Sequence, residues 1–180
     1  DRERYRREYV DDIFHALDWL GIHCEEGPSS VADFDKYWAQ HHRKSLYDDA
    51  LKSILEQDWV YACDCTRKDL VTSGTYPVYF GKCRDLKKSF HEKSAWRWRI
   101  KEGTSIYWAD LFQADTTLNL SEQMGDFVVK QKNGLPSYQL GSYVDDLHFN
   151  ITHIIRGADL LTSTAAQLYM ATYWKSTDFQ

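Results

Sequence analysis

The sequence predicts a single α/β domain over residues 1–180. Strand-like and helical patterns alternate along the chain, which is the order typical of α/β folds. Hydrophobic residues make up 43% of the 180 residues and include seven Trp, which is enough apolar material for one core. The third observation is an Asn-Gly turn between two strand-like runs at 126–138, which is typical of a β-hairpin.

The N-terminal part contains two amphipathic helical patterns and a strand. Residues 3–20 place apolar side chains at helical spacing, and Gly21 follows where a helix C-cap belongs. A second such pattern runs from 43 to 57, and residues 59–63 then predict a short strand.

Strands are predicted again further along the chain. Residues 95–100 alternate Trp and Arg, which predicts a strand with one basic face, and 107–112 is a second strand candidate. The hairpin at 126–138 consists of a strand, the turn and a return strand.

The C-terminal part is predicted to begin with a helix at 138–147. Residues 151–155 form a short apolar run that predicts a buried strand. Thr164-Ala-Ala-Gln167 fits a capping box that opens the last helix, which runs to about residue 174.

Charge and hydropathy exclude some classes of protein. The net charge of −5 and pI near 5.8 argue against a uniformly basic nucleic-acid-binding surface, although a local basic patch stays open. No apolar run reaches the length of a membrane span, and the N-terminus is charged rather than signal-like. We therefore expect a cytoplasmic, monomeric protein with no membrane partner.

A candidate metal site lies in the irregular, turn-rich stretch 64–92 and the residue just before it. Cys63, Cys65 and Cys83 can supply three thiolates to a tetrahedral zinc ion, which would hold together a loop with little core of its own. The alternative is that the three are free buried thiols. Spacing leaves the fourth donor open among Tyr79, Asp64, His91 and water.

A candidate ligand site pairs Tyr138 with Arg156. An Arg at the end of the strand predicted at 151–155 would face the ligand crevice of an open α/β sheet and could bind a carboxylate through two parallel hydrogen bonds. A nearby Tyr could add a hydroxyl group. The alternative is that Arg156 forms a structural ion pair with Asp145, Asp146 or Asp159.

The run Trp96-Arg97-Trp98-Arg99 admits two interpretations. Aromatic and basic residues together can bind nucleic acid. More often, one face of such a strand packs in the core and the other is solvated.

Several motifs closely resemble the glutamyl-tRNA synthetase catalytic core. They are Tyr138-Gln-Leu-Gly-Ser-Tyr-Val-Asp-Asp and the run from Ile151 to Gln167. The runs that begin at Tyr61 and Tyr79 resemble the zinc insertion of the glutamyl-queuosine branch, and the resemblance covers nearly the whole chain. It implies a Rossmann-like class I aminoacyl-tRNA synthetase catalytic domain, incomplete here, with a zinc-bearing insertion at 60–92.

The resemblance also implies roles for individual residues. Tyr138 and Arg156 hold the glutamate substrate, and Ser142 lines the same pocket. Arg156 would act by positioning and charge neutralisation, so no acid or base catalyst is expected in this chain. One structural zinc ion would be held by the branch's three cysteines and a tyrosine, which here are Cys63, Cys65, Tyr79 and Cys83.

The implied activity is ATP-dependent activation of L-glutamate, with Mg²⁺ accompanying ATP. Glutamate is then transferred to the queuosine nucleoside of tRNA(Asp). The family's His-containing nucleotide signature is expected before Asp1 and its Lys-containing signature after Gln180. We therefore expect this segment alone to be inactive.

Two alternatives to this function remain. The first is an ordinary glutamyl-tRNA synthetase that charges tRNA(Glu), against which the tyrosine in the zinc pattern argues. The second is a non-catalytic relative in which zinc stabilises a module that binds tRNA or glutamate.

Overall fold

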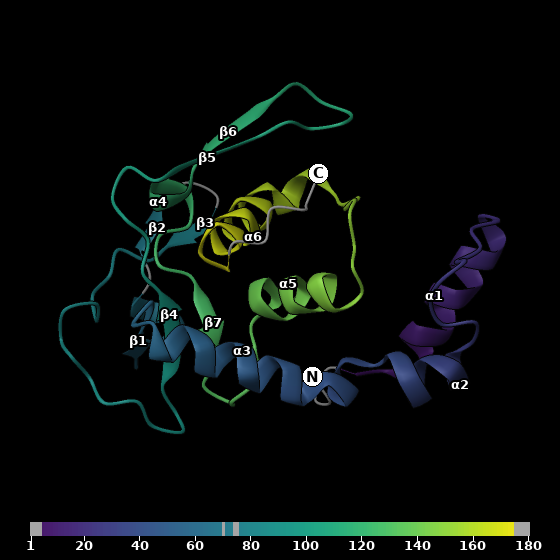
Figure 1. Cartoon of the computed structure of the whole chain (residues 1–180), viewed down its shortest axis with the longest axis horizontal. Helices are drawn as coiled ribbons and strands as arrows, with labels where there is room; N and C mark the ends of the chain where they lie inside the picture. Colours follow the sequence, from purple (N-terminus) through teal and green to yellow (C-terminus); the bar gives the residue numbers. More distant parts are fainter. Residues whose placement is uncertain (1–4, 70, 74–75, 175–180) are drawn as a thin grey trace. The chain divides into compact units, whose positions relative to one another are not determined.

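The computed structural model describes residues 5–69, 71–73 and 76–174 and confirms the α/β class (Figure 1). The chain divides into two compact units, residues 1–46 and 47–180, and each is described by itself. None of the described helices is both long and apolar enough to cross a membrane.

The first unit consists of helical segments. The helix predicted at 3–20 is present as α1 (Arg7–Trp19), although residues 3 and 4 lie outside the described residues. Gly21 follows it with φ of +68°, the left-handed conformation that ends many helices. Three short segments follow among the described residues of this unit: α2 (Val31–Asp33), the π-helical turn η1 (Phe34–Trp38) and the 3₁₀ turn η2 (Gln40–Arg43).

The second unit is built on a three-stranded antiparallel sheet in the order β1-β4-β7. Its strands are β1 (Val60–Cys63), β4 (Ala95–Trp98) and β7 (Val128–Lys130), which confirms three predicted strands. The helix α3 (Lys44–Glu56) precedes β1 and confirms the helix predicted at 43–57.

The core of this unit is aromatic. Trp98 is fully buried, and its ring lies 5.4 Å from that of Trp59 and 5.5 Å from that of Trp174. The helices α5 (Tyr138–His148) and α6 (Leu161–Trp174) pack against each other beside the sheet, and α5 also contacts β7 (Figure 1). Tyr143 of α5 stacks on Trp174 of α6 at 5.3 Å, so the two helices share this core.

Two small hairpins extend the second unit. The stretch 64–92 is largely irregular, as predicted, but it contains the 3₁₀ turn η3 (Arg67–Asp69) and the paired strands β2 (Val71–Ser73) and β3 (Tyr76–Val78). The strand predicted at 107–112 is shifted to β5 (Ser105–Trp108), which pairs with the unpredicted β6 (Thr116–Asn119). The short helix α4 (Leu120–Gln123) follows at once.

Two local predictions near the C-terminus need correction. The return strand of the predicted hairpin is reduced to a bridge between Lys130 and Pro136, because proline has no N–H to continue a ladder. Thr164 does not cap the last helix, since α6 begins at Leu161 after the 3₁₀ turn η4 (Ala158–Leu160). The Thr164 hydroxyl instead donates to the carbonyl of Leu160 within the first turn.

The buried strand predicted at 151–155 is wrong. This segment has no regular structure and is exposed, with Ile155 87% accessible. No described strand lies beside it to accept its backbone hydrogen bonds, and every pair of described strands is antiparallel. The parallel sheet implied by a Rossmann-like fold is therefore not formed among the described residues.

Candidate metal centre and ligand site

Three structural elements bring the four predicted metal ligands together. Cys63 ends β1, and Cys65 follows two residues later. Tyr79 comes directly after β3, and Cys83 lies in the turn beyond it. Cys63, Tyr79 and Cys83 are buried and Cys65 is half-buried, so the loop folds over its own cysteines.

The four side chains converge on one point. The sulfur atoms of Cys63, Cys65 and Cys83 all lie within 4.8 Å of one another, and none is in a disulfide bond. The Tyr79 hydroxyl oxygen lies 3.4 Å from Sγ of Cys63 and 3.5 Å from Sγ of Cys65. A tetrahedral zinc ion with Zn–S bonds of about 2.3 Å separates its sulfur ligands by about 3.8 Å, so the donor set fits zinc.

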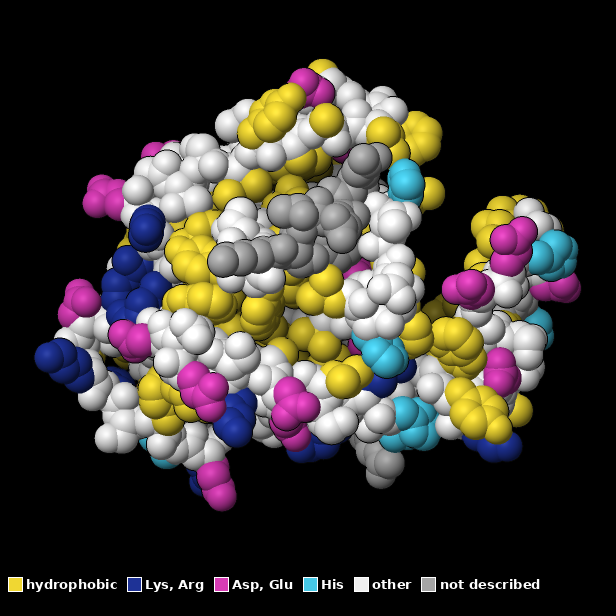
Figure 2. Space-filling model, in the orientation of Figure 1, with side chains coloured by type: hydrophobic (Ala, Val, Ile, Leu, Met, Phe, Trp, Pro, Cys, Tyr) yellow, Lys and Arg dark blue, Asp and Glu magenta, His cyan; other side chains and the backbone are white. Residues whose placement is uncertain are grey.

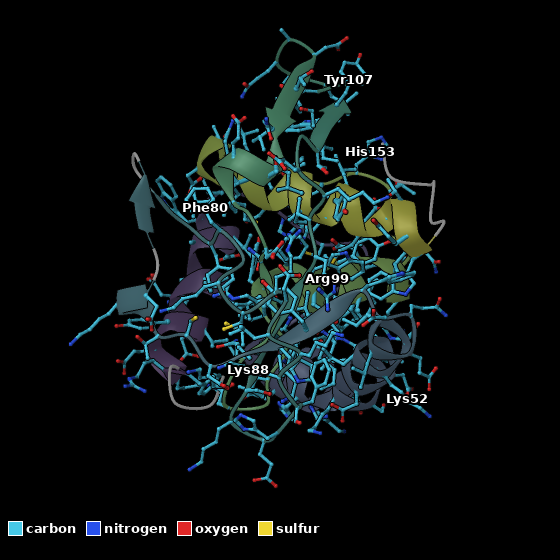
Figure 3. All side chains as sticks on the ribbon, turned by 90° about the vertical axis from the view of Figure 1, so that its left-hand side faces the viewer. Lys52, Phe80, Lys88, Arg99, Tyr107 and His153 are labelled. Atoms are coloured by element: carbon cyan, nitrogen blue, oxygen red, sulfur yellow. The ribbon has the colours of Figure 1, made fainter. Side chains whose placement is uncertain are left out.

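Two of the candidate fourth donors are engaged with other partners. The Asp64 carboxylate accepts hydrogen bonds from Nζ of Lys88 at 2.7 Å and contacts Nε2 of His91 at 3.0 Å. The ion pair with Lys88 lowers the pKa of the Asp64 carboxyl group. Figure 3 labels Lys88 and Phe80, which flank Cys83 in the sequence. Asp64 and His91 are thus engaged with each other, Asp64 also pairs with Lys88, and Tyr79 is the candidate that lies among the sulfur atoms.

The site favours different protonation states at different ligands. Burial raises the pKa of the Tyr79 phenol, and hydrogen bonding with the cysteines raises it further. Burial also acts to raise the pKa of the Cys83 thiol, but hydrogen bonding with Tyr79 and Cys65 outweighs it and lowers the pKa to about 7. One thiol therefore ionises near neutral pH, which favours metal capture because the thiolate is the binding form.

Gly125 fixes the position of Tyr79. The two residues form an isolated bridge, and the N–H of Asp126 donates to the Tyr79 carbonyl at 3.2 Å. Gly125 has φ of +64°, and a Cβ added there would overlap the Tyr79 carbonyl oxygen. Only glycine allows this close backbone approach, which holds the phenol against the cysteines.

The sequence did not reveal the charged residues beneath the metal cluster. Asp126 is 1% exposed, and its carboxylate accepts from Tyr61 Oη at 2.6 Å, from Arg84 Nε at 2.8 Å and from the Ile100 N–H at 2.8 Å. Burial and the hydrogen bond to Asp126 raise the pKa of the Tyr61 phenol. A single Asp before a strand gave no signal of this role.

The alternating run at 96–99 does not form a solvated basic face. Arg97 is 8% exposed, and its Nη1 donates to the backbone carbonyl of Asp126 at 2.7 Å. Figure 2 shows Lys and Arg side chains interspersed with Asp and Glu side chains on one face of the molecule. The buried position of Arg97 removes it from any surface that could contact RNA.

The predicted ligand-site residues lie between the start of α5 and the segment after it. Tyr138 occupies the first turn of α5 and is 51% exposed, and Ser142 lies one helical turn later on the same face. Arg156 lies in irregular backbone rather than at the end of a strand. The convergence of these side chains on one ligand stays a prediction.

Arg156 has an unsatisfied buried group. Its Nη1 is buried and has no hydrogen-bond partner among the described residues. Asp146 is close enough to interact electrostatically: burial raises the pKa of its carboxyl group to about 6, and Arg156 opposes that rise. Asp145 instead accepts a hydrogen bond from the Tyr47 hydroxyl at 2.6 Å. Arg156 therefore retains a buried N–H without a partner among the described residues, which makes it a candidate to bind an acidic group.

Curated relatives match this chain over nearly its full length. A glutamate–tRNA ligase from Natranaerobius thermophilus is 33% identical over 99% of this chain and 40% of its own length. A glutamyl-Q tRNA(Asp) synthetase from Cupriavidus metallidurans is 37% identical over 94% of this chain and 54% of its own length. The chain thus spans between two fifths and about half of the length of these relatives.

Solved structures agree on the fold. The structure of a glutamate tRNA ligase from Elizabethkingia meningosepticum matches 96% of this chain with a TM-score of 0.73 at 21% identity. A glutamate-tRNA synthetase from Elizabethkingia anophelis matches 94% with a TM-score of 0.72. The family model for tRNA synthetases class I (E and Q), catalytic domain, matches residues 1–179. The chain therefore belongs to the class I tRNA synthetase (E and Q) catalytic domain family.

Proposed function

We propose that the protein containing this chain is a ligase that activates L-glutamate with ATP and Mg²⁺ and transfers it to the queuosine nucleoside of tRNA(Asp). The family assignment supports a synthetase reaction. The observation that carries the choice of an acidic substrate is the buried Nη1 of Arg156, which has no partner among the described residues. A buried N–H of this kind costs about 1–3 kcal/mol unless a partner binds it.

In this proposal, Arg156 binds the substrate carboxylate, Tyr138 supplies a hydroxyl group and Ser142 lines the pocket. The three residues position glutamate and neutralise its charge, and they move no proton. Positioning of this kind lowers the barrier because the reacting groups are held at a productive distance. Ser142 is half-buried and Tyr138 is half-exposed, which supports the access of a substrate to both side chains.

The metal centre supports the finer choice of substrate. The convergence of the Tyr79 hydroxyl with three cysteine sulfurs fits the zinc insertion of the glutamyl-queuosine branch that the sequence resembles. Zinc bound by Cys63, Cys65, Tyr79 and Cys83 would fix the irregular stretch 64–92 against the sheet. The ion is structural in this proposal.

The test uses the intact protein that contains this chain. ATP–pyrophosphate exchange is measured with each of the twenty amino acids, and we expect exchange with glutamate alone. Labelled glutamate is then offered with tRNA(Asp) that carries queuosine, with tRNA(Asp) that lacks it, and with tRNA(Glu). ATP–pyrophosphate exchange that needs no glutamate, or the lack of any exchange, would refute the proposed glutamate-activating ligase function.

A second candidate is the charging of tRNA(Glu), which the similarity to the Natranaerobius glutamate–tRNA ligase favours. If tRNA(Glu) becomes labelled and queuosine-containing tRNA(Asp) does not, the protein charges tRNA(Glu) and the transfer to queuosine is refuted. A non-catalytic relative would bind glutamate in equilibrium titration without ATP turnover.

A further inference from the structure

We propose that Arg97 is a positioning residue of the metal centre, whose guanidinium holds two of the four ligands and offsets the negative charge of the loaded site. This inference rests on the zinc site of the proposed function. It concerns a residue outside the ligand set, on a strand that supplies no ligand.

One guanidinium contacts two ligands. Nε of Arg97 donates to Sγ of Cys63 at 3.3 Å. Its guanidinium carbon lies 3.7 Å from the centre of the Tyr79 ring, which is a close cation–π contact. Its Nη1 is anchored on the carbonyl oxygen of Asp126 at 2.7 Å, so the side chain is fixed at three points.

The strand register explains the contact with Cys63. In the antiparallel pair of β1 and β4, Tyr61 lies opposite Arg97, and Cys63 lies opposite Ala95. Because side chains alternate between the two faces of a sheet, all four point to the same face. Arg97 is therefore the diagonal neighbour of Cys63, within the reach of a long side chain.

Charge balance gives Arg97 a function in the loaded site. Three thiolates alone outweigh the charge of a divalent zinc ion, so the buried centre would be net negative even with Tyr79 bound as a neutral phenol. Nearby cations are already paired with carboxylates: Lys82 with Asp69, Arg84 with Asp126 and Lys88 with Asp64. Among the described residues, Arg97 forms no such ion pair, and its charge is directed at the ligands.

A second arginine provides a matched control. Arg99 lies two positions further along and is labelled in Figure 3. Its guanidinium carbon lies 5.0 Å from the ring centre of Tyr61, which is not a proposed ligand, and its Nη1 donates to the carbonyl of Arg84 at 3.2 Å. A variant at Arg99 therefore perturbs the same region without touching a sulfur atom or Tyr79.

The experiment measures zinc affinity by competition with a chromogenic chelator, and the absorption spectrum after Co²⁺ substitution. The intact protein is compared as wild type, Arg97→Met, Arg97→Lys and Arg99→Met. We expect Arg97→Met to bind zinc roughly 10- to 100-fold more weakly, as is typical when an outer-sphere partner is lost, and to shift the thiolate-to-cobalt charge-transfer band. Arg97→Lys should be intermediate, and Arg99→Met should match the wild type in both measurements.

A purely structural role would lower stability without shifting the cobalt band. Wild-type affinity and spectrum in Arg97→Met would overturn the role of Arg97 and leave the zinc site intact. If Arg97→Met does not fold, Arg97→Lys decides by the same two measurements, and unchanged values in it overturn the role. A wild-type protein that binds no metal would overturn both this inference and the proposed zinc site.

Discussion

The hydroxyl oxygen of Tyr79 lies 3.4 Å from the sulfur of Cys63, although sixteen positions separate the two residues in the chain. The bridge from Tyr79 to Gly125 and the end of β1 create this proximity. A phenol is an uncommon zinc ligand, so its place among three cysteine sulfurs is a specific feature that mutation can test.

Tyr79→Phe should weaken zinc binding by more than the roughly 10- to 100-fold that outer-sphere substitutions cause, because it removes a donor atom. The affinity is measured by chelator competition. Tyr61→Phe is the matched control, since it removes a buried phenol that donates to Asp126 rather than one that contacts the cysteines. Equal zinc affinity in wild type and Tyr79→Phe would show that water or another group is the fourth ligand.

Cys65→Ala should abolish the binding of about one zinc ion per chain, because tetrahedral structural sites need four ligands. Without the metal, the stretch 63–83 loses its main cross-link. Amide hydrogen exchange in that stretch should therefore accelerate, while exchange in α6 stays near the wild-type rate. Cys24→Ala, at an exposed cysteine of the first unit, is the control. Carefully prepared wild-type protein without zinc would contradict the prediction.

Asp126→Asn should lower the free energy of unfolding by about 3 kcal/mol, because it leaves the buried side of Arg84 without its counter-charge. Urea denaturation followed by tryptophan fluorescence measures the change. Asp58→Asn is the control: Asp58 is 91% exposed and lies 4.0 Å from Arg99, so its loss should cost less than about 0.5 kcal/mol. If both variants lose a similar amount of unfolding free energy, the buried ion pair of Asp126 contributes no more to stability than an exposed one.

Asp146→Asn should change the pH dependence of stability. Burial raises the pKa of Asp146 from 3.8 to about 6 in the folded state, so folding favours the protonated carboxyl group. The contribution of the Asp146 carboxyl group to the free energy of unfolding is fully present below pH 3.8 and is lost as the pH rises through about 6.

The Asn variant cannot ionise. Its free energy of unfolding relative to that of the wild type should therefore increase by about 1 kcal/mol from pH 4 to pH 7.5, a value that allows for solvent screening of a half-buried group. Thermal unfolding at the two pH values checks this. A difference between variant and wild type that does not change with pH would contradict it.

Arg156→Ala should weaken glutamate binding to the intact protein by about 1.5–3 kcal/mol, since a charged hydrogen bond to the substrate carboxylate is lost. The fold should be kept, because Nη1 of Arg156 has no partner among the described residues. Isothermal titration with glutamate measures the affinity. Lys52→Ala removes an exposed cation that pairs loosely with Glu56 at 3.9 Å and should leave binding unchanged. Normal glutamate affinity in Arg156→Ala would remove this residue from the site.

Local patterns were sufficient for most regular elements of this chain. The apolar spacing that predicted α3 reflects which face of that helix is buried, and this information is contained in a few consecutive turns. The same holds for β1 and β4, whose residues are almost all buried. The spacing also predicted α1, although α1 has no buried residue. Motif resemblance then predicted the family that residues 1–179 match.

Elements that depend on a partner strand were harder to predict. The apolar run at 151–155 has the composition of a buried strand, but a strand needs a neighbour for its backbone hydrogen bonds, and none of the described strands supplies one. The strand β6 was missed for the opposite reason, since its polar sequence Thr-Thr-Leu-Asn forms a strand only because β5 pairs with it.

The sequence by itself determined the α/β class, the family and three cysteines as candidate metal ligands, because these depend on residue type and on spacing within short segments. Only the tertiary structure brought Tyr79 among the cysteine sulfurs, turned Asp64 and His91 toward other partners and buried Arg97 beneath the cluster. The physical reason is that these contacts cross between β1, β4 and the bridge at Gly125. Sheet register and close backbone approach set such contacts, and neither is encoded in the spacing of any single segment.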